Sequence, residues 1–272
     1  MPLIAALQMV SGPHVEANLL EAERLIAKAA DAGAKLVVLP ENFALMGRRE
    51  ADKVAARETP GDGPLQHFLA AQAVRRQLWL VGGTIPLAAS DDRRVRASCL
   101  LYDDQGRLAA RYDKIHLFDV QIVDSGERYA ESATIEPGGQ PVVADTPFGR
   151  LGLAVCYDLR FPELYRSYAL SGVNLFLISA EWPVRRIDHW NTLLRARAIE
   201  NQSFMVAVNT VGKSGAATYG GSSAVISPWG ETLLQAPSDT EAVLSCEIDF
   251  SQLAIVRAHM PVFSDRRPDL YK

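Results

Sequence analysis

The chain has 272 residues, of which 48% are hydrophobic and 22% charged, a composition typical of a soluble globular protein with one large core or two smaller ones. Its 28 Lys and Arg against 32 Asp and Glu give a formal net charge of −4, which offers no electrostatic case for nucleic acid or an anionic membrane as a partner. Three cysteines without CxxC spacing argue against a disulfide scaffold, and no signal-like or membrane-spanning apolar run is present, so we expect a cytoplasmic protein.

The first elements predict a βαβ unit. Residues 3–10 have the pattern of a buried strand, and the following segment places apolar residues three and four apart up to Gly33, which is typical of an amphipathic helix. A short apolar strand over residues 35–39 follows, which favours an α/β layered architecture. Glu41 comes directly after that strand, where burial favours the neutral form of a carboxyl group. Glu41 is therefore a candidate general base, with a helix-capping or surface glutamate as the alternative.

The alternation of strands and helices continues through the second quarter of the chain. A helix is expected to start at Pro64 and a strand to cover residues 78–83. Residues 97–102 and 107–112 flank a turn that contains glycine, which predicts a β-hairpin. Lys114 emerges from this hairpin as a second side chain with potential chemistry at a strand end. A surface cation is the alternative reading.

A single cysteine marks the next strand end. Residues 151–155 form an apolar run that ends at Cys156, and Pro162 is typical of the first turn of a helix. Backbone N–H groups and the helix dipole at such a position favour a thiolate, although most free cysteines are buried structural residues. Ligands bind at the carboxyl ends of strands in open α/β sheets, so we expect Glu41, Lys114 and Cys156 to converge on one crevice.

The remainder of the chain predicts two more helices and four more strands. The helices are expected over residues 162–172 and 188–201, and the strands over 173–178, 203–209, 222–227 and 241–249. Trp182 leaves the sheet after one of these strands, where it would be either a wall of the pocket or an ordinary packed aromatic residue. We treat residues 1–272 as a single domain in which 251–272 form a C-terminal arm. The arm is too apolar to hang free, so it is expected to pack at a subunit interface.

Five ordered blocks of sequence resemble the nitrilase superfamily of carbon–nitrogen hydrolases. They are Leu39-Pro40-Glu41-Asn42, Lys114-Ile115-His116-Leu117-Phe118-Asp119, Glu131-Ser132 ahead of Pro137-Gly138, residues 155–163 and residues 195–201. The resemblance implies an α/β fold, a four-layer α-β-β-α sandwich whose subunits pair to extend the layers. It also implies a Glu–Lys–Cys triad on Glu41, Lys114 and Cys156, with Glu131 as a second active-site glutamate.

The reaction implied is hydrolysis of an amide through a thioester on the cysteine, with release of ammonia and without a cofactor. Amide carbonyls are poor electrophiles, so the reaction needs a thiolate, a base to generate it and donors around the oxyanion. We expect Glu41 to take the proton of Cys156 and return it to the leaving nitrogen. Lys114 and the backbone N–H of Tyr157 would stabilise the oxyanion, and Glu131 would hold Lys114 or the substrate amide.

Within the superfamily the chain looks most like the small ω-amidase and deaminated glutathione amidase branch, whose substrates carry a carboxylate near the amide. A cation must then bind that carboxylate, and Arg160, Arg185 and Arg186 are the candidates. Phe118 and Trp182 are further candidates for contact with substrate. Nitrile hydrolysis and hydrolysis of N-carbamoyl amino acids fit the same triad, so the substrate stays open.

Other readings of the sequence carry less support. A papain-like pairing of Cys156 with His116 or His189 lacks the surrounding pattern of such enzymes, and five histidines without an HExxH motif or a Cys/His cluster predict no metal site. A catalytically inactive scaffold on the same fold would be expected to lack a member of the triad. The partners expected are therefore a small amide substrate and a second copy of the chain, in a dimer or a larger oligomer.

Overall fold

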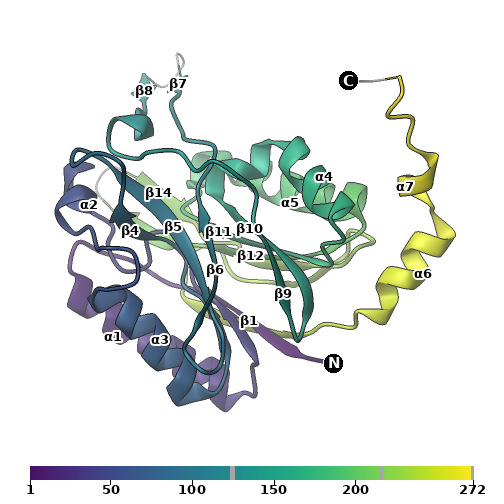
Figure 1. The fold of residues 1–272 in the computed structure, drawn as a ribbon, viewed down its shortest axis with the longest axis horizontal. Coiled ribbons are helices and arrows are strands. Elements are labelled where there is room, and N and C mark those ends of the chain that lie inside the picture. The colour runs from purple at the N-terminus through teal and green to yellow at the C-terminus, as the bar shows by residue number, and fades with distance from the viewer. Residues whose placement is uncertain (123–125, 215–216, 271–272) are drawn as a thin grey trace.

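Two β-sheets stack face to face in the computed structural model, which describes residues 1–122, 126–214 and 217–270 (Figure 1). Within those residues the larger sheet has seven strands in the order β17-β1-β2-β3-β5-β4, and β6 also pairs with β5. Its strands are β1 (Leu3–Gln8), β2 (Leu36–Val38), β3 (Trp79–Val81), β4 (Ile85–Ala88), β5 (Val95–Tyr102), β6 (Leu108–Asp113) and β17 (Ala242–Glu247). β1, β2 and β3 run parallel, and β5 and β6 form the predicted hairpin.

The second sheet has six strands in the described chain, in the order β16-β15-β12-β11-β10-β9. They are β9 (Val143–Thr146), β10 (Gly149–Val155), β11 (Leu175–Ala180), β12 (Phe204–Asn209), β15 (Ala224–Ile226) and β16 (Thr232–Gln235). β10, β11 and β12 are parallel at its centre. Each sheet thus holds three adjacent parallel strands, whose carboxyl ends are where ligands bind in α/β folds.

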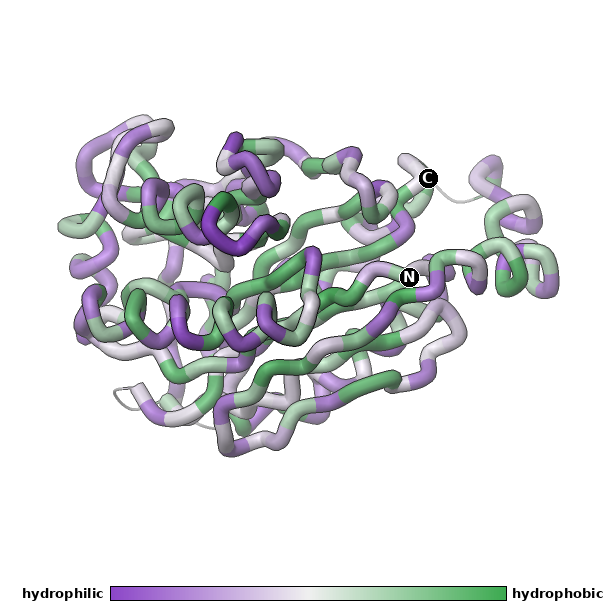
Figure 2. Tube along the Cα trace, turned by 90° about the horizontal axis from the view of Figure 1, so that it is seen from below, coloured by the Kyte–Doolittle hydropathy of each residue, from purple (hydrophilic) through white to green (hydrophobic). Residues whose placement is uncertain are grey.

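Helices cover the outer face of each sheet. α1 (Val15–Asp31) and α3 (Pro64–Arg76) pack on the first sheet, and α4 (Pro162–Leu170) and α5 (Ile187–Asn201) pack on the second. Figure 2 shows hydrophobic stretches along the strands, while the helix in front changes between hydrophobic and hydrophilic residues along its length. The four-layer α-β-β-α sandwich predicted from the sequence is confirmed.

Alternation along the strands explains the layers. In β1, Ile4 and Ala6 face the core between the two sheets, whereas Ala5 and Leu7 face the helices on the outside. Because neighbouring residues of a strand point to opposite faces, a strand buried on both sides reads as a continuous apolar run. This is why the strands were visible in the sequence, whereas the pairing of the two sheets was not.

Smaller elements complete the structure. They are β7 (Gln121–Ile122), β8 (Glu127–Arg128), β13 (Val211–Ser214), β14 (Ala217–Gly220), α2 (Ala51–Ala55), α6 (Ser251–His259), α7 (Val262–Asp265) and the 3₁₀ turns Glu131–Ala133, Cys156–Arg160 and Val184–Arg186. In the part of the chain that is described, no helix is both long and apolar enough to cross a membrane.

The C-terminal arm extends beyond the two sheets, with α6 and α7 at the edge of the molecule (yellow in Figure 1). Within its own chain it is held by a 2.6 Å hydrogen bond from Gln202 Nε2 to the carbonyl oxygen of Met260, and by Arg257, which donates to the carbonyl oxygen of Gln202. Residues 271 and 272 of the predicted arm lie outside the described residues. Packing of the arm on a partner subunit stays a prediction.

Candidate active site

Glu41 lies directly beyond β2, between the two sheets. Its side chain is 1% exposed, and Oε1 lies 2.9 Å from the Nζ of Lys114. Oε2 accepts a 3.1 Å hydrogen bond from the backbone N–H of Glu181, which follows β11 in the other sheet. The ends of β2 and β3 are in close contact: Gly83 has φ +54°, and a Cβ there would clash with the carbonyl oxygen of Pro40. Glycine at this position therefore lets the backbone carry Glu41 into the interior.

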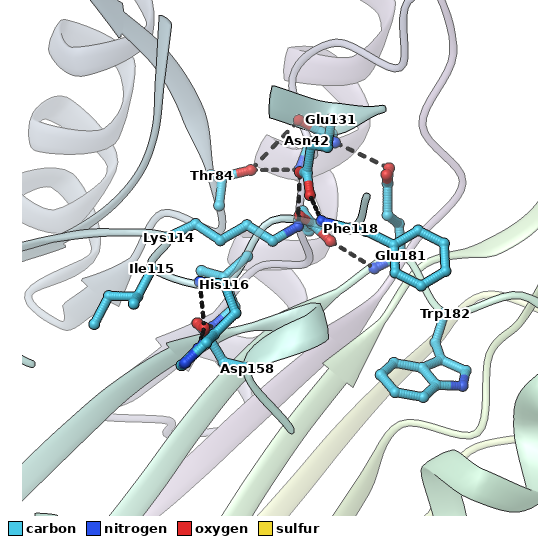
Figure 3. A network of polar contacts seen from close by, with 12 residues as sticks. Asn42, Thr84, Lys114, Ile115, His116, Phe118, Glu131, Asp158, Glu181 and Trp182 are labelled. Atoms are coloured by element: carbon cyan, nitrogen blue, oxygen red, sulfur yellow. Dashed lines mark hydrogen bonds and ion pairs between the residues drawn. The ribbon is translucent and has the colours of Figure 1, made fainter. Parts of the chain in front are cut away.

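Lys114 follows β6 and bridges two carboxylates (Figure 3). Its Nζ lies 2.7 Å from Oε1 of Glu131, in addition to its contact with Glu41. Oε2 of Glu131 accepts a 2.6 Å hydrogen bond from the backbone N–H of Phe118. Burial alone would lower the pKa of Lys114, but the carboxylates of Glu131 and Glu41 raise it well above its ordinary value. Lys114 therefore remains a fixed positive charge within the site.

The two carboxylates that share Lys114 have different acidities. Burial raises the pKa of Glu41 to about 7, in spite of Lys114, and the charges of Glu181 and Glu131 act in the same direction as burial. Burial also opposes ionisation of Glu131, but Lys114 and the N–H of Phe118 hold the pKa of Glu131 below its ordinary value. Glu41 is therefore the carboxyl group that exchanges a proton near neutral pH, and Glu131 stays ionised.

Cys156 is the first residue after β10. It begins the 3₁₀ turn over residues 156–160, which we call the nucleophile turn after the role that the sequence predicts for Cys156. Its φ of +46° lies in the left-handed region that non-glycine residues rarely adopt. Its side chain lines a cavity of about 200 Å³ together with Lys114 and Glu131. The convergence predicted for the residues at the ends of three strands, β2, β6 and β10, is therefore observed.

The thiol of Cys156 is buried, which opposes the thiolate that its position at a strand end favours. Burial raises the pKa of this thiol well above its ordinary value, the charge of Glu41 raises it further, and Lys114 opposes the shift. The nucleophile turn has five residues and is separate from α4, so Cys156 does not face the end of a long helix dipole. Burial thus favours the neutral thiol at Cys156, and a neighbouring base is needed to ionise it.

Asp158 is a further buried carboxylate and belongs to the nucleophile turn itself. Its Oδ2 accepts the backbone N–H of Val155 at 2.8 Å and the hydroxyl of Tyr112 at 2.6 Å. Its Oδ1 accepts the backbone N–H of His116 at 3.1 Å and lies 2.7 Å from Nδ1 of the same residue, as Figure 3 shows. Asp158 thus ties the nucleophile turn to the segment that follows β6, and the sequence had assigned it no role.

The histidines of the alternative Cys–His pairing are engaged elsewhere. Nδ1 of His116 is paired with Asp158, and Nδ1 of the exposed His189 lies 3.2 Å from a guanidinium nitrogen of Arg160. Across the described ranges, neither histidine forms a hydrogen bond with Cys156. The geometry gives this alternative no support.

Tyr157 is the second residue of the nucleophile turn. Backbone N–H groups at the start of a helical turn have no partner within it, so the N–H of Tyr157 is available in the region of Cys156. The tyrosine ring packs against Phe118 and Phe161, with centroid distances of 4.9 and 5.2 Å. The proposed role of this N–H towards an oxyanion stays a prediction.

The three residues expected to contact substrate, Phe118, Arg160 and Trp182, all line the cavity. The guanidinium carbon of Arg160 lies 4.8 Å from the centre of the Trp182 ring, a cation–π arrangement. No carboxylate forms an ion pair with Arg160 within the residues described. Its guanidinium is therefore available to an anion that enters the cavity.

The other two candidate arginines are occupied. Arg185 and Arg186 both pair with the carboxylate of Glu127, at 2.5 and 3.1 Å. Arg186 lines the cavity and lies over the ring of Phe118, whereas Arg185 is exposed and outside the lining. Of the three arginines, Arg160 is thus the best placed to bind a substrate carboxylate.

Four further charged residues line the cavity without having been predicted, namely Glu50, Lys53, Arg128 and Glu181. Glu181 accepts a 2.9 Å hydrogen bond from Nδ2 of Asn42, and Lys53 reaches the cavity from the short helix α2. No local pattern marks either residue, because each reaches the site through folding of a connecting segment. Among the residues that the structure describes, no group of three His, Cys, Asp or Glu could hold a metal ion.

Comparison with known proteins decides the family. Residues 3–258 match the family described as carbon–nitrogen hydrolase. The chain belongs to the carbon–nitrogen hydrolase family. It is 41% identical to a deaminated glutathione amidase of Yersinia enterocolitica over 97% of this chain and 92% of the relative. It is 36% identical to the Xenopus laevis omega-amidase NIT2-A over 98% of this chain and 96% of the relative.

Solved structures agree with the family assignment. The Caenorhabditis elegans NitFhit protein matches all of this hydrolase with a TM-score of 0.89 and 33% identity, and the match spans 66% of that longer chain. This likeness supports the stacked α/β architecture described above. As a member of the family, the protein is a hydrolase of non-peptide carbon–nitrogen bonds, the enzyme class that the sequence predicted.

Proposed function

We propose that the protein is an amidase in which Cys156 is the nucleophile and Glu41 the general base. The observation that carries the proposal is the ion-paired cluster in which Lys114 bridges Glu41 and Glu131 beside the cavity that Cys156 lines. A cysteine whose pKa is raised by burial needs a base, and a carboxyl group whose pKa is about 7 is matched to that task at neutral pH.

The chemical steps follow from these groups. Glu41 takes the proton from Sγ of Cys156, and the thiolate attacks the carbonyl carbon of the amide, which forms a C–S bond and an oxyanion. Lys114 and the N–H of Tyr157 donate to that oxyanion, and each such donor is worth roughly 3–4 kcal/mol of transition-state stabilisation. Glu41 then protonates the leaving nitrogen, the C–N bond breaks, and a thioester remains.

Hydrolysis of the thioester uses the same base. Glu41, again a carboxylate, takes a proton from water, whose oxygen attacks the thioester carbon, and the C–S bond then breaks. The proton on Glu41 returns to the sulfur of Cys156. Glu131 is not consumed in either half of the reaction, and its contacts with Lys114 and with the N–H of Phe118 suit it to hold the ammonium in place.

The substrate we propose is a small amide that bears a carboxylate. Two observations support it: Arg160 lines the cavity without a carboxylate partner among the described residues, and the relatives above are named for deaminated glutathione and for ω-amides. Hydrolysis of a nitrile or of an N-carbamoyl amino acid by the same triad is the alternative.

Ammonia release from a panel of substrates tests the proposal. The panel contains 2-oxoglutaramate, deaminated glutathione, butyramide, butyronitrile and an N-carbamoyl amino acid, with free amine measured for deaminated glutathione. We expect turnover of the carboxylate-bearing amides, accumulation of an acyl-enzyme visible by intact mass, and loss of both in Cys156→Ala with an unchanged circular dichroism spectrum. Retained turnover in Cys156→Ala would contradict the nucleophile, and a wild-type protein inert towards the whole panel would support the inactive scaffold.

We also propose a cytoplasmic homo-oligomer, a dimer or larger. The arm that extends from the sheets exposes apolar side chains, with Ile255 at 55%, Met260 at 49% and Leu270 at 69%, and such surface favours a protein partner. Three free cysteines suit a reducing compartment. Light scattering on the full-length protein tests the assembly, and a monomer at micromolar concentration would refute it.

A further inference from the structure

Lys53 is a largely buried cation on the wall of the active-site cavity. Its side chain is 11% exposed and belongs to α2, a helix of five residues between the first two strand–helix units. In the described chain its ion-pair partner is Glu50, with 3.4 Å between Nζ and Oε2, and the Glu50 side chain is 63% exposed. Burial removes most of the water that would solvate this ammonium, and a single solvent-exposed partner at 3.4 Å does not compensate for that loss.

The charge of Lys53 persists in this setting. Burial alone would lower the pKa of Lys53, but the carboxylates of Glu181, Glu50, Glu131 and Glu41 together raise it. Three of these carboxylates belong to the active site, and the charge of Lys53 in turn contributes to the lowered pKa of Glu131. The charge of Lys53 therefore acts on the carboxylates of the site.

The other cations of the cavity are committed or lie elsewhere. Lys114 is shared by two carboxylates, and Arg186 is paired with Glu127. Arg160 lies over Trp182, on the wall formed by the loop after β11. Arg128 of β8 also lines the cavity but is exposed to solvent. Lys53 is thus a largely buried cation, besides Arg160, with capacity to bind an anion inside the cavity.

We propose that Lys53 binds an anionic group, a carboxylate, of the amide substrate and so determines the preference of the enzyme for charged amides. The inference rests on the proposed amidase function and deepens it. A substrate carboxylate at Lys53 would supply the strong partner that Glu50, at 3.4 Å and exposed to water, does not. The carboxylate belongs either to the acyl half of the substrate, which becomes the thioester, or to the half that leaves as an amine.

The competing role for Lys53 is electrostatic support of Glu131 and Glu41. The two roles differ in which substrates they affect. Loss of a carboxylate anchor slows charged amides alone, whereas loss of electrostatic support slows every amide and moves the pH profile. A set of matched substrates therefore separates them.

The experiment measures kcat and KM for wild type, Lys53→Met, Lys53→Arg and the control Lys28→Met, which removes an exposed lysine of α1. Succinamate and butyramide differ by a carboxylate on the acyl half; butyrylglycine and butyrylglycinamide differ by one on the leaving half. For at least one charged substrate, we expect Lys53→Met to lower kcat/KM by roughly 10–100-fold through KM, while its neutral match changes less than about threefold. Lys53→Arg is expected to recover most of the loss, and Lys28→Met to match wild type.

Inhibition by succinate gives a second readout that does not need turnover. Succinate should inhibit wild type more strongly than Lys53→Met if the carboxylate lies on the acyl half, with thermal unfolding used to show that the variants are folded. Equal losses for charged and neutral amides, or no loss for any charged amide, would overturn the inference. Failure of the proposed function is distinguishable, because wild type would then release amine from none of the four substrates.

Discussion

Two buried carboxylate clusters lie near Cys156, and they are built differently. In the first, Glu41 and Glu131 share the single ammonium of Lys114. In the second, Asp158 accepts hydrogen bonds from backbone and side-chain donors on both of its oxygens. Negative charge exceeds positive charge in the first cluster, whereas donors surround the one carboxylate of the second.

This difference in construction indicates different roles: the first cluster is suited to proton transfer and the second to holding the backbone in position. Where two carboxylates compete for one cation, burial leaves one of them with a pKa near 7, and that group can move protons during turnover. Where a carboxylate accepts donors on both of its oxygens, those hydrogen bonds hold the neighbouring backbone in place. Glu41 and Asp158 are both fully buried acids, yet we expect substitution to affect activity in one case and stability in the other.

The largest effect is expected from Glu41→Gln. Loss of the general base should lower kcat by roughly 10²–10⁴-fold. Because burial favours the neutral form of Glu41, a neutral glutamine should cost little thermal stability. Steady-state rates and thermal unfolding, with the exposed Glu231→Gln as control, test both parts. A variant that loses activity only because it unfolds would break the distinction between the two clusters.

The next effect is the pH dependence of the wild-type enzyme. Glu41 acts as a base only when ionised, and its pKa is about 7, so the active fraction falls as the pH falls below 7. On butyramide, which does not titrate in this range, kcat/KM should drop about tenfold per pH unit and be about 100-fold below its plateau at pH 5. An acid limb near pH 4.5 would show that burial does not shift Glu41 as described.

A smaller effect on rate and a larger effect on stability are expected from Asp158→Asn. The amide group cannot accept all the hydrogen bonds that the carboxylate accepts, so a buried donor is left unsatisfied, at about 1–3 kcal/mol of unfolding free energy. The nucleophile turn should shift slightly and kcat/KM fall about tenfold. Chemical denaturation measures the loss of unfolding free energy, and Asp239→Asn, at an exposed aspartate, is the control. Since Asp158 acts through position, the acid limb should stay near pH 7; a displaced limb would contradict that role.

Much of the catalytic site was predictable because it lies at strand ends. Glu41, Lys114 and Cys156 each follow an apolar run, and a buried strand that ends in a reactive side chain is visible in a single sequence. Glu131, which lies in no such strand, was found only through the resemblance of its sequence block. The alternation of strands and helices predicted an α/β layered architecture, and the resemblance implied its four layers.

The acidity of the site and its additional charged residues were decided by the tertiary structure. The strand-end position of Cys156 favours a thiolate, whereas burial and the charge of Glu41 raise the pKa of its thiol, because a pKa depends on neighbours brought from other strands. Lys53 and Asp158 carry no local signal, since the carboxylates that raise the pKa of Lys53 include Glu181 and Glu131, and the donors Tyr112 and His116 reach Asp158 from a distant segment. The sequence by itself determined which residues can react and at which strand ends they lie, while packing of one sheet on the other determined which of them holds the proton.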